Sequence, residues 1–293
     1  MTENLQRPSI AACVTLFHPD ESVDKLLTAL RETYDDLILI DNGGGSGLIE
    51  PGDVVVRKPD GNVGVSWALN LGVGEARDRG YQWVAYFDQD SWPHYRSAEL
   101  AARLSQAAAG TAIVSAQYVD RATGRSGYRD RRLHGYPLAP ISSGSAFRVA
   151  AWEAVGGFET RLPVDLVDTE YALRVQQAGY SIELETGLEL DHSVGAKTDY
   201  RILGRQLTPA GHVPWRLYTK LDASVVVLPR YLRTFPNWSA RHIKERVLET
   251  GVEIVLGSQR RDILRMIGRW ILRRTPAPIR RINATSAGLK PGG

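Results

Sequence analysis

The amino-acid sequence predicts an α/β protein: a helix-covered sheet followed by a helical C-terminal segment. Through the first half of the chain, short apolar runs alternate with amphipathic stretches, which is the pattern of strands and helices in a layered α/β domain. From about residue 215 onward, apolar residues recur three or four positions apart, which indicates helices. The chain is 43% hydrophobic and 24% charged, and this composition excludes a disordered or fibrous protein.

Apolar runs bounded by turn-forming residues predict the first four strands at residues 10–17, 37–41, 53–58 and 83–88. Helical spacing predicts helices over residues 20–33 and 65–76. Because strands and helices alternate here, we expect these four strands to be parallel. Further along the chain, we expect a strand at residues 111–119, a long polar loop at 120–135 and a helix at 168–178.

Two features of the sequence bear on where the protein works. A single cysteine, Cys13, excludes a disulfide framework and a cysteine-based zinc site, and we expect it to be a small core residue. The first residues have no apolar core of a secretory signal, and no run approaches the ~20 apolar residues of a membrane span. We therefore expect a cytoplasmic protein, soluble or peripheral on the inner face of the cell membrane.

The charge is divided unequally along the chain. Residues 1–200 hold 18 Lys and Arg against 28 Asp and Glu, whereas residues 201–293 hold 18 against 5. We therefore expect an acidic α/β domain over residues 1–200 and a basic, mainly helical region over 201–293 with a disordered end. Arginines interleaved with Ile, Leu and Trp suit an anionic lipid surface better than nucleic acid, which we do not expect as a partner. Alternatively, the apolar residues pack on the first domain or on a second subunit, in a homo-oligomer.

Paired carboxylates follow the fourth predicted strand in the segment FDQDSWP. Asp88 and Asp90 stand one residue apart at the carboxyl end of that strand, where open α/β sheets bind ligands. Such oxygen donors suit Mg²⁺ or Mn²⁺, which in turn neutralises a diphosphate. The alternative is a solvated turn.

Further polar groups follow other strands of the predicted sheet. They are Asp41, Asn62 with Gly64, the segment ISSGSAF, the acids Asp165, Asp168 and Glu170 at a helix start, and His192. The three acids could instead be first-turn residues favoured by the helix dipole, and a single histidine could be structural.

Seven short motifs, in this order along residues 9–197, resemble the inverting glycosyltransferases of family 2: VTLFHP, IDN, NVGVSWALNLG, DQDS, SSG, VDTEYALR and HSVG. More narrowly, they look like the bacterial rhamnosyltransferase branch that uses dTDP-L-rhamnose. The resemblance implies the GT-A fold, a Rossmann-like mixed sheet with helices on both faces. It also implies metal-dependent transfer of L-rhamnose from dTDP-β-L-rhamnose to a glycan or lipid-linked saccharide in bacterial surface polysaccharide synthesis.

The resemblance also implies roles for individual residues. The nucleotide would contact Thr15, Phe17, Asp41, Asn62, Gly64 and Asp88, and the metal would be bound by Asp90 and His192 with Asp88. Asp168 would be the catalytic base that takes the proton from the attacking hydroxyl, so that one displacement inverts the anomeric carbon. On the acceptor side we expect Ser143, Gly144, Trp92 and Glu170, although Glu170 could instead pair with Arg174, and Trp92 could merely cap the strand.

The sequence departs from the pattern of this branch at His18, where asparagine is usual, and this affects the predicted nucleotide contacts. Two alternatives to rhamnosyl transfer remain open: a family 2 transferase with a UDP-sugar donor, and a non-catalytic, membrane-associated protein that binds nucleotide sugars. A sugar-phosphate nucleotidyltransferase is disfavoured because residues 16–21 contain no glycine-rich basic loop.

Overall fold

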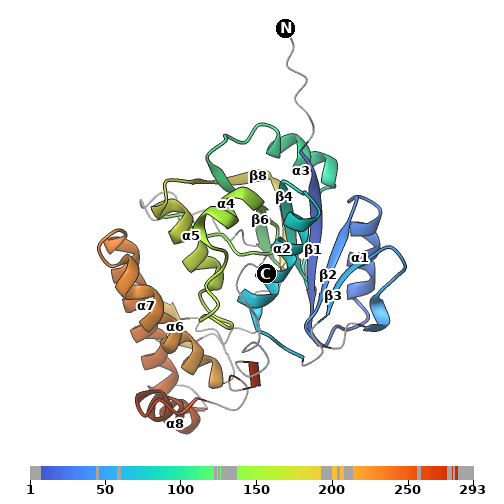
Figure 1. Ribbon diagram of the computed structural model, residues 1–293. Coiled ribbons are helices and arrows are strands. Elements are labelled where there is room, and N and C mark those ends of the chain that lie inside the picture. The colour runs from blue at the N-terminus through green and yellow to red at the C-terminus, as the bar shows by residue number, and fades with distance from the viewer. Residues whose placement is uncertain are drawn as a thin grey trace.

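A mixed sheet forms the centre of the molecule (Figure 1). The computed structural model describes residues 8–43, 46–57, 61–121, 124, 126, 137–192, 200–202, 205–207, 214–255, 259–275, 279, 281 and 282. In this part of the chain the sheet has eight strands in the order β3-β2-β1-β4-β7-β6-β8-β5. Their bounds are β1 Ile10–Leu16, β2 Leu37–Asp41, β3 Val54–Arg57, β4 Trp83–Asp88, β5 Trp92–Pro93, β6 Thr111–Asp120, β7 Ser145–Arg148 and β8 Ser181–His192.

The first four predicted strands are parallel, as the alternation of strands and helices predicts. β1 pairs in parallel with β2 and β4, and β2 with β3. β7 then runs antiparallel between β4 and β6, and this makes the sheet mixed, as the resemblance implies. The register places Thr15 beside Asp88 and Leu16 beside Asp41, so the ends of β1, β2 and β4 meet at one edge.

Helices cover both faces of the sheet, and two hydrophobic clusters fill the layers between them. One cluster lies under α2 (Val65–Asp78), α4 (Val149–Val155) and α5 (Val167–Gln177); the other lies under α1 (Val23–Arg31) and α3 (Ser97–Leu104). Cys13 is fully buried, as predicted, and a Cβ added to Gly72 of α2 would lie 2.4 Å from its sulfur. Helix α2 can therefore pack closely on β1 only because residue 72 is glycine.

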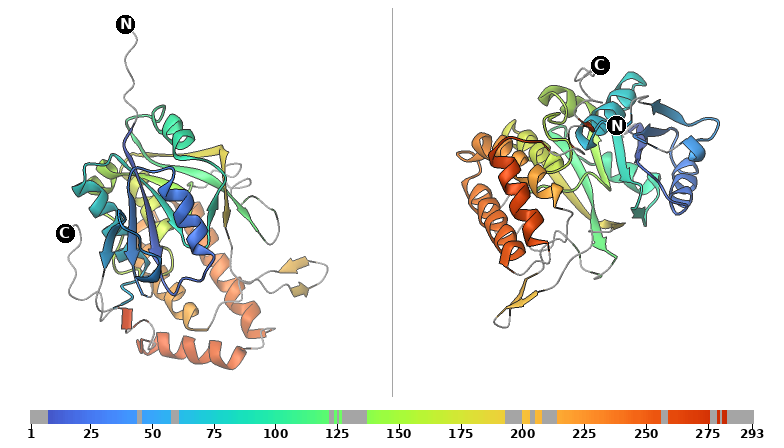
Figure 2. Two further views of the ribbon diagram at one scale, coloured as in Figure 1. Left: turned by 90° about the vertical axis from the view of Figure 1, so that its right-hand side faces the viewer. Right: turned by 90° about the horizontal axis from the view of Figure 1, so that it is seen from below.

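Three helices make up most of the described C-terminal region: α6 (Trp215–Tyr231), α7 (Pro236–Val255) and α8 (Arg260–Ile271). Helix α8 packs against both α6 and α7 (Figure 2). Ala223, Val227 and Tyr231 of α6 belong to the same core cluster as α2 and α5, so α6 is part of the α/β body. Within the described residues, no helix is long and apolar enough to cross a membrane.

Smaller elements complete the described chain. They are the short helix η1 (Ser46–Leu48) and an antiparallel ribbon of β9 (Tyr200–Ile202) and β10 (Arg205–Leu207), which projects from the body (Figure 2). Several predicted features lie outside the described residues: the disordered end at 286–293, most of the loop at 120–135, position 58 of the third strand, and residues 193–195 of the last motif.

Candidate active site

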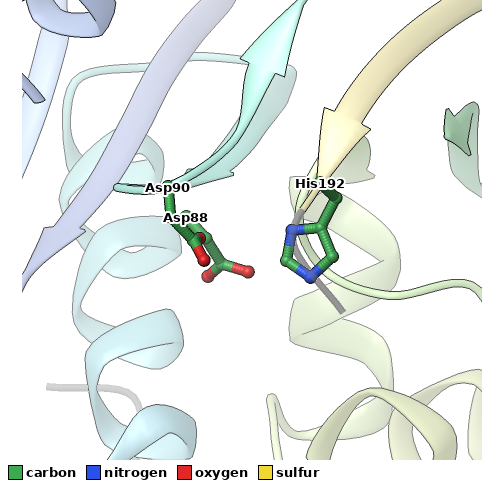
Figure 3. Close-up of side chains that lie close together, drawn as sticks. All are labelled: Asp88, Asp90 and His192. Carbon is green, nitrogen blue, oxygen red and sulfur yellow. The ribbon is translucent and has the colours of Figure 1, made fainter. Parts of the chain in front are cut away.

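Two carboxylates and an imidazole converge at the carboxyl edge of the sheet (Figure 3). Each of Asp88, Asp90 and His192 offers one ligand atom, and these atoms all lie within 4.8 Å of one another. Asp88 ends β4, and Asp90 follows in a turn that the Ser91 amide closes by donating to the Asp88 carbonyl at 3.0 Å. His192 arrives from the end of β8, because β5 pairs Trp92 with Asp191. Carboxylate oxygens with one imidazole suit a divalent cation such as Mn²⁺ or Mg²⁺.

Hydrogen bonds through two serine hydroxyl groups connect His192 to the backbone of Asp88. The Nδ1 atom of His192 lies 2.8 Å from the Ser91 hydroxyl, which is 2.7 Å from the Ser143 hydroxyl, and the Asp88 amide donates to Ser143 Oγ at 2.9 Å. The neutral tautomer in which Nδ1–H donates to Ser91 Oγ leaves the Nε2 lone pair for a metal. Such outer contacts fix the ring orientation of a metal-binding histidine.

Burial shifts the pKa values of the acids at this edge. Burial, followed by the nearby charges of Asp168 and Asp90, raises the pKa of Asp88 to about 7. Burial also raises the pKa of Asp168 to about 6, although hydrogen bonds from Ser142 oppose the shift. Burial lowers the pKa of His192, which keeps the imidazole neutral and able to bind a metal. Crowded carboxylates in a weakly polar site are a setting that a bound cation stabilises.

Asp168 lies in the first turn of α5 with one carboxylate oxygen unused. Its Oδ1 atom is buried and has no hydrogen-bond partner among the residues that the structure describes. The helix starts after Leu166, whose backbone is in the left-handed region at φ 62°. A non-glycine residue in this conformation is strained, and such strain is frequent at functional sites. The free oxygen makes Asp168 suited to accept a proton from a bound ligand.

Phe17, one of the residues predicted to contact the nucleotide, presents an exposed aromatic ring. Phe17 is 42% exposed, and a Cβ added to Gly43 would lie 3.3 Å from its ring, so the loops after β1 and β2 meet here. Gln89 clamps Phe17 in place: the Phe17 amide donates to Gln89 Oε1 at 2.9 Å, and Gln89 Nε2 donates to the Phe17 carbonyl at 3.0 Å. Sequence reasoning missed Gln89, although its place between two site aspartates was a signal.

The departure at His18 has a conformational explanation. His18 has a left-handed backbone at φ 45°, and its amide donates to the Gly43 carbonyl at 2.7 Å. Asparagine and histidine are among the non-glycine residues enriched in this region. Histidine can therefore replace asparagine here without changing the path of the loop that carries Phe17.

Of the other residues predicted to contact the nucleotide, one lies at the carboxyl edge of the sheet and two hydrogen-bond to neighbouring side chains or backbone. Asp41 ends β2 at this edge and accepts a hydrogen bond from the Gly43 amide at 3.2 Å. Thr15 accepts one from the Tyr86 hydroxyl at 2.6 Å. Asn62 accepts hydrogen bonds from the Asn42 side chain at 3.1 Å and the Gly64 amide at 2.8 Å, and so joins the end of β2 to the segment before α2.

Gly64 allows two backbone segments to approach each other closely. Its φ is 86°, and a Cβ added there would lie 2.7 Å from the Pro163 carbonyl oxygen. The neighbouring Val65 amide donates to that same oxygen at 2.7 Å. Gly64 therefore lets α2 start directly against the segment that precedes Asp168.

Three residues predicted on the acceptor side are buried in this structure. Ser143 is 1% exposed and hydrogen-bonds to the Ser91 hydroxyl, and a Cβ added to Gly144 would lie 2.9 Å from Leu190 Cδ2. Glu170 is 0% exposed and pairs with Arg174 at 2.8 Å, which was the alternative interpretation. Trp92 is half-buried and pairs with β8, which leaves its predicted role untested.

Side chains of helix α6 bind the acidic residues that precede and follow Asp168 in the sequence. Asp165 pairs with Arg216 at 2.9 Å and accepts a hydrogen bond from Thr219. Glu170 pairs with Arg230 at 3.0 Å and accepts a hydrogen bond from the Tyr231 hydroxyl at 2.9 Å. These partners could not be predicted from local sequence patterns, because they lie more than 50 residues further along the chain.

A cavity of about 170 Å³ opens between the start of α5 and α7. Leu166 and Thr169, which flank Asp168 in the sequence, line one side, and Trp238, Arg241 and Glu245 line the other. Its lining combines an aromatic ring with charged side chains of both signs. Such a lining suits an uncharged, polar ligand such as a sugar ring better than an apolar one.

In both sequence and fold, the chain is similar to nucleotide-sugar glycosyltransferases. Among curated proteins, the chain is 24% identical over 244 residues to the dTDP-rhamnosyl transferase RfbF of Shigella flexneri, across 75% of this chain and 80% of that protein. This match confirms the predicted resemblance to bacterial rhamnosyltransferases. No family model matches the chain.

Solved glycosyltransferase structures share the fold. A mannosyltransferase of Pyrobaculum calidifontis, solved with GDP-mannose and Mn²⁺, superposes with a TM-score of 0.56 at 16% identity, over 98% of this chain and 82% of that chain. TarS of S. aureus superposes with a TM-score of 0.55 at 11% identity, over 94% of this chain and 50% of that chain. These likenesses confirm the predicted fold class.

Proposed function

We propose that this chain is a metal-dependent, inverting rhamnosyltransferase that takes L-rhamnose from dTDP-β-L-rhamnose. The observation that carries the proposal is the group formed by Asp88, Asp90 and His192, close to the unpartnered Oδ1 of Asp168, at the carboxyl edge of the sheet. Similarity to a dTDP-rhamnosyl transferase supports the donor, and Mn²⁺ in the mannosyltransferase supports a divalent metal.

The residues fit a divalent cation, since three donors from two strands already face one another without it. Asp88, Asp90 and His192 would hold Mg²⁺ or Mn²⁺, which would stabilise negative charge on the departing diphosphate. Ser91 and Ser143 keep the histidine ring and the Asp88 backbone in place.

Asp168 performs the proton transfer in this proposal. Its Oδ1 takes the proton of an acceptor hydroxyl as that oxygen attacks the anomeric carbon from the face opposite dTDP. The new carbon–oxygen bond forms while the bond to the diphosphate oxygen breaks, and the bonding electron pair leaves with dTDP. One displacement inverts the configuration.

The nucleotide would lie against Phe17, with the pyrimidine ring stacked on the exposed aromatic face and bonded to Asp41. The acceptor would enter from the opposite side, through the cavity between α5 and α7 that Leu166 and Thr169 border. We propose a glycan or a lipid-linked saccharide as this acceptor, since the cavity suits a sugar ring.

Nucleotide release tests the proposal and separates its alternatives. The chain is incubated with a mixture of saccharide acceptors and either dTDP-L-rhamnose or UDP-sugars, each with Mn²⁺, with Mg²⁺ and with excess EDTA. We expect metal-dependent release of dTDP from dTDP-L-rhamnose. Release from a UDP-sugar alone would favour another donor. Binding of dTDP without turnover of any donor would favour a non-catalytic protein that binds nucleotide sugars.

A further inference from the structure

Helix α8 exposes apolar side chains along one side. On its other side it packs against α6 and α7, and Ile263 is its one buried residue. Leu264 and Ile271 are 53% and 66% exposed, and they are seven positions apart in the sequence, so they lie two turns apart on one stripe. Leu272, directly after the helix, is 63% exposed. Nothing in the described chain covers these side chains.

Helix α8 is also strongly basic, and the arginines in its first turn do not stabilise the helix. Residues 259–275 hold six arginines and a single acid, Asp262. Arg260 and Arg261 occupy the first turn, where the helix dipole disfavours cations, and α8 has no side-chain cap at this end. Both are exposed, and neither has an ion-pair partner among the described residues. On a helical projection they flank Leu264, one on each side.

We propose that the exposed side of α8 binds an anionic lipid surface, with the helix lying in the interface and Leu264 and Ile271 turned into it. An amphipathic helix with arginines beside an apolar stripe has the features of interfacial helices. A second copy of this chain fits less well, because a twofold interface would bring the arginines of both copies together. Charge complementarity therefore favours anionic lipid.

The exposed side of α8 lies toward the same end of the molecule as the candidate active site. Helices α6, α7 and α8 lie toward the end of the molecule to which β1 to β4 run, which is also the edge that carries Asp88 (Figures 1 and 2). A protein bound through α8 would therefore hold that edge near the lipid surface. The proposal does not depend on the donor sugar or on the reaction, since it concerns binding alone.

Vesicle flotation with the full chain tests the proposal. The probes are phosphatidylcholine vesicles with and without phosphatidylglycerol, at low and at high salt. We expect binding to the anionic vesicles only, weakened by salt. The double variant Arg260→Gln/Arg261→Gln should bind about thirtyfold more weakly, which is the loss expected for two basic side chains at such a surface. The matched control Arg96→Gln/Arg103→Gln removes two exposed arginines from the region of α3 and should bind like the unmodified chain.

A second variant tests the apolar stripe. Leu264→Ser/Ile271→Ser changes two exposed side chains, so the fold should keep its thermal stability while binding to anionic vesicles falls at least tenfold. Equal binding by the arginine variant and its control would overturn the proposal. So would absence of binding to either vesicle, or a dimer in sedimentation velocity that the Leu264→Ser/Ile271→Ser variant makes monomeric.

Discussion

Replacing Asp168 by asparagine should lower turnover and raise stability at the same time. Asparagine keeps the shape of the side chain but cannot take a proton, so we expect turnover to fall by at least about a hundredfold, the scale of a general base. Affinity for dTDP with Mn²⁺ should stay within about twofold, because Asp168 is outside the group of proposed metal ligands.

The stability gain follows from the pKa of Asp168, which burial raises from 3.8 to about 6. An acid with a raised pKa in the folded state binds protons more tightly when folded, so it favours folding below about pH 4. That contribution is lost as the pH rises through about 6. At pH 8, replacing the ionised Asp168 by asparagine should therefore raise the free energy of unfolding by up to roughly 3 kcal/mol, the energy that corresponds to a pKa of about 6 in place of 3.8. The figure is an upper bound because asparagine alters the Ser142 hydrogen bonds.

The same pKa predicts the pH profile of the unmodified enzyme. The base must be ionised to act, so kcat/KM should fall about tenfold per unit as the pH drops below about 6. Steady-state kinetics, calorimetric titration with dTDP and urea unfolding at pH 8 measure the three effects. Near-normal turnover of Asp168→Asn, or lower stability with lost dTDP binding, would refute the reasoning.

Three further predictions follow from the neighbouring groups. Asp90→Ala should abolish the gain in dTDP affinity that Mn²⁺ provides, measured by calorimetry; unchanged affinity would remove Asp90 from the metal site. Ser91→Ala should weaken Mn²⁺ binding roughly tenfold or more, because His192 loses its Nδ1 partner; an unchanged metal titration would contradict this. Glu170→Ala should lower the free energy of unfolding by about 2 kcal/mol, since it removes a fully buried carboxylate that Arg174, Arg230 and the Tyr231 hydroxyl contact. The control Arg161→Ala removes a 61% exposed partner and should cost less than about 1 kcal/mol; equal losses would contradict a buried ion-pair role.

Local sequence patterns were sufficient for much of the fold. β2 and β4 were predicted at their observed bounds, and the predicted ends of β1 and β3 differ from the observed ones by at most one residue, because apolar runs ended by turn residues mark buried strands clearly. The antiparallel β7 had no such signal. Its direction depends on pairing with β4 and β6, which are remote in the sequence, and only the family resemblance implied a mixed sheet.

At the site, too, local motifs predicted some residues correctly, whereas contacts with residues remote in the sequence could not be predicted. Asp88, Asp90 and His192 were predicted as a set, and the structure brings them together. The burial of Ser143 could not be foreseen, because its hydrogen-bond partners, the Asp88 amide and the Ser91 hydroxyl, lie more than 50 residues earlier in the chain. Likewise, the partners that bury Glu170 belong to α6, far along the chain, so a first-turn acid on a helix looked exposed.

Metal-dependent donor turnover tests the central claim most directly. A ³¹P NMR time course follows dTDP-L-rhamnose and a lipid-linked saccharide acceptor with the unmodified chain and Mg²⁺, then after excess EDTA, then after Mg²⁺ is restored. We predict conversion of the sugar-diphosphate signals into those of dTDP, arrest with EDTA and resumption with Mg²⁺. Conversion at the same rate with EDTA, or no conversion with Mg²⁺ or Mn²⁺ when a lipid-linked saccharide is supplied, would contradict the claim that Asp88, Asp90 and His192 form the metal centre of a rhamnosyltransferase.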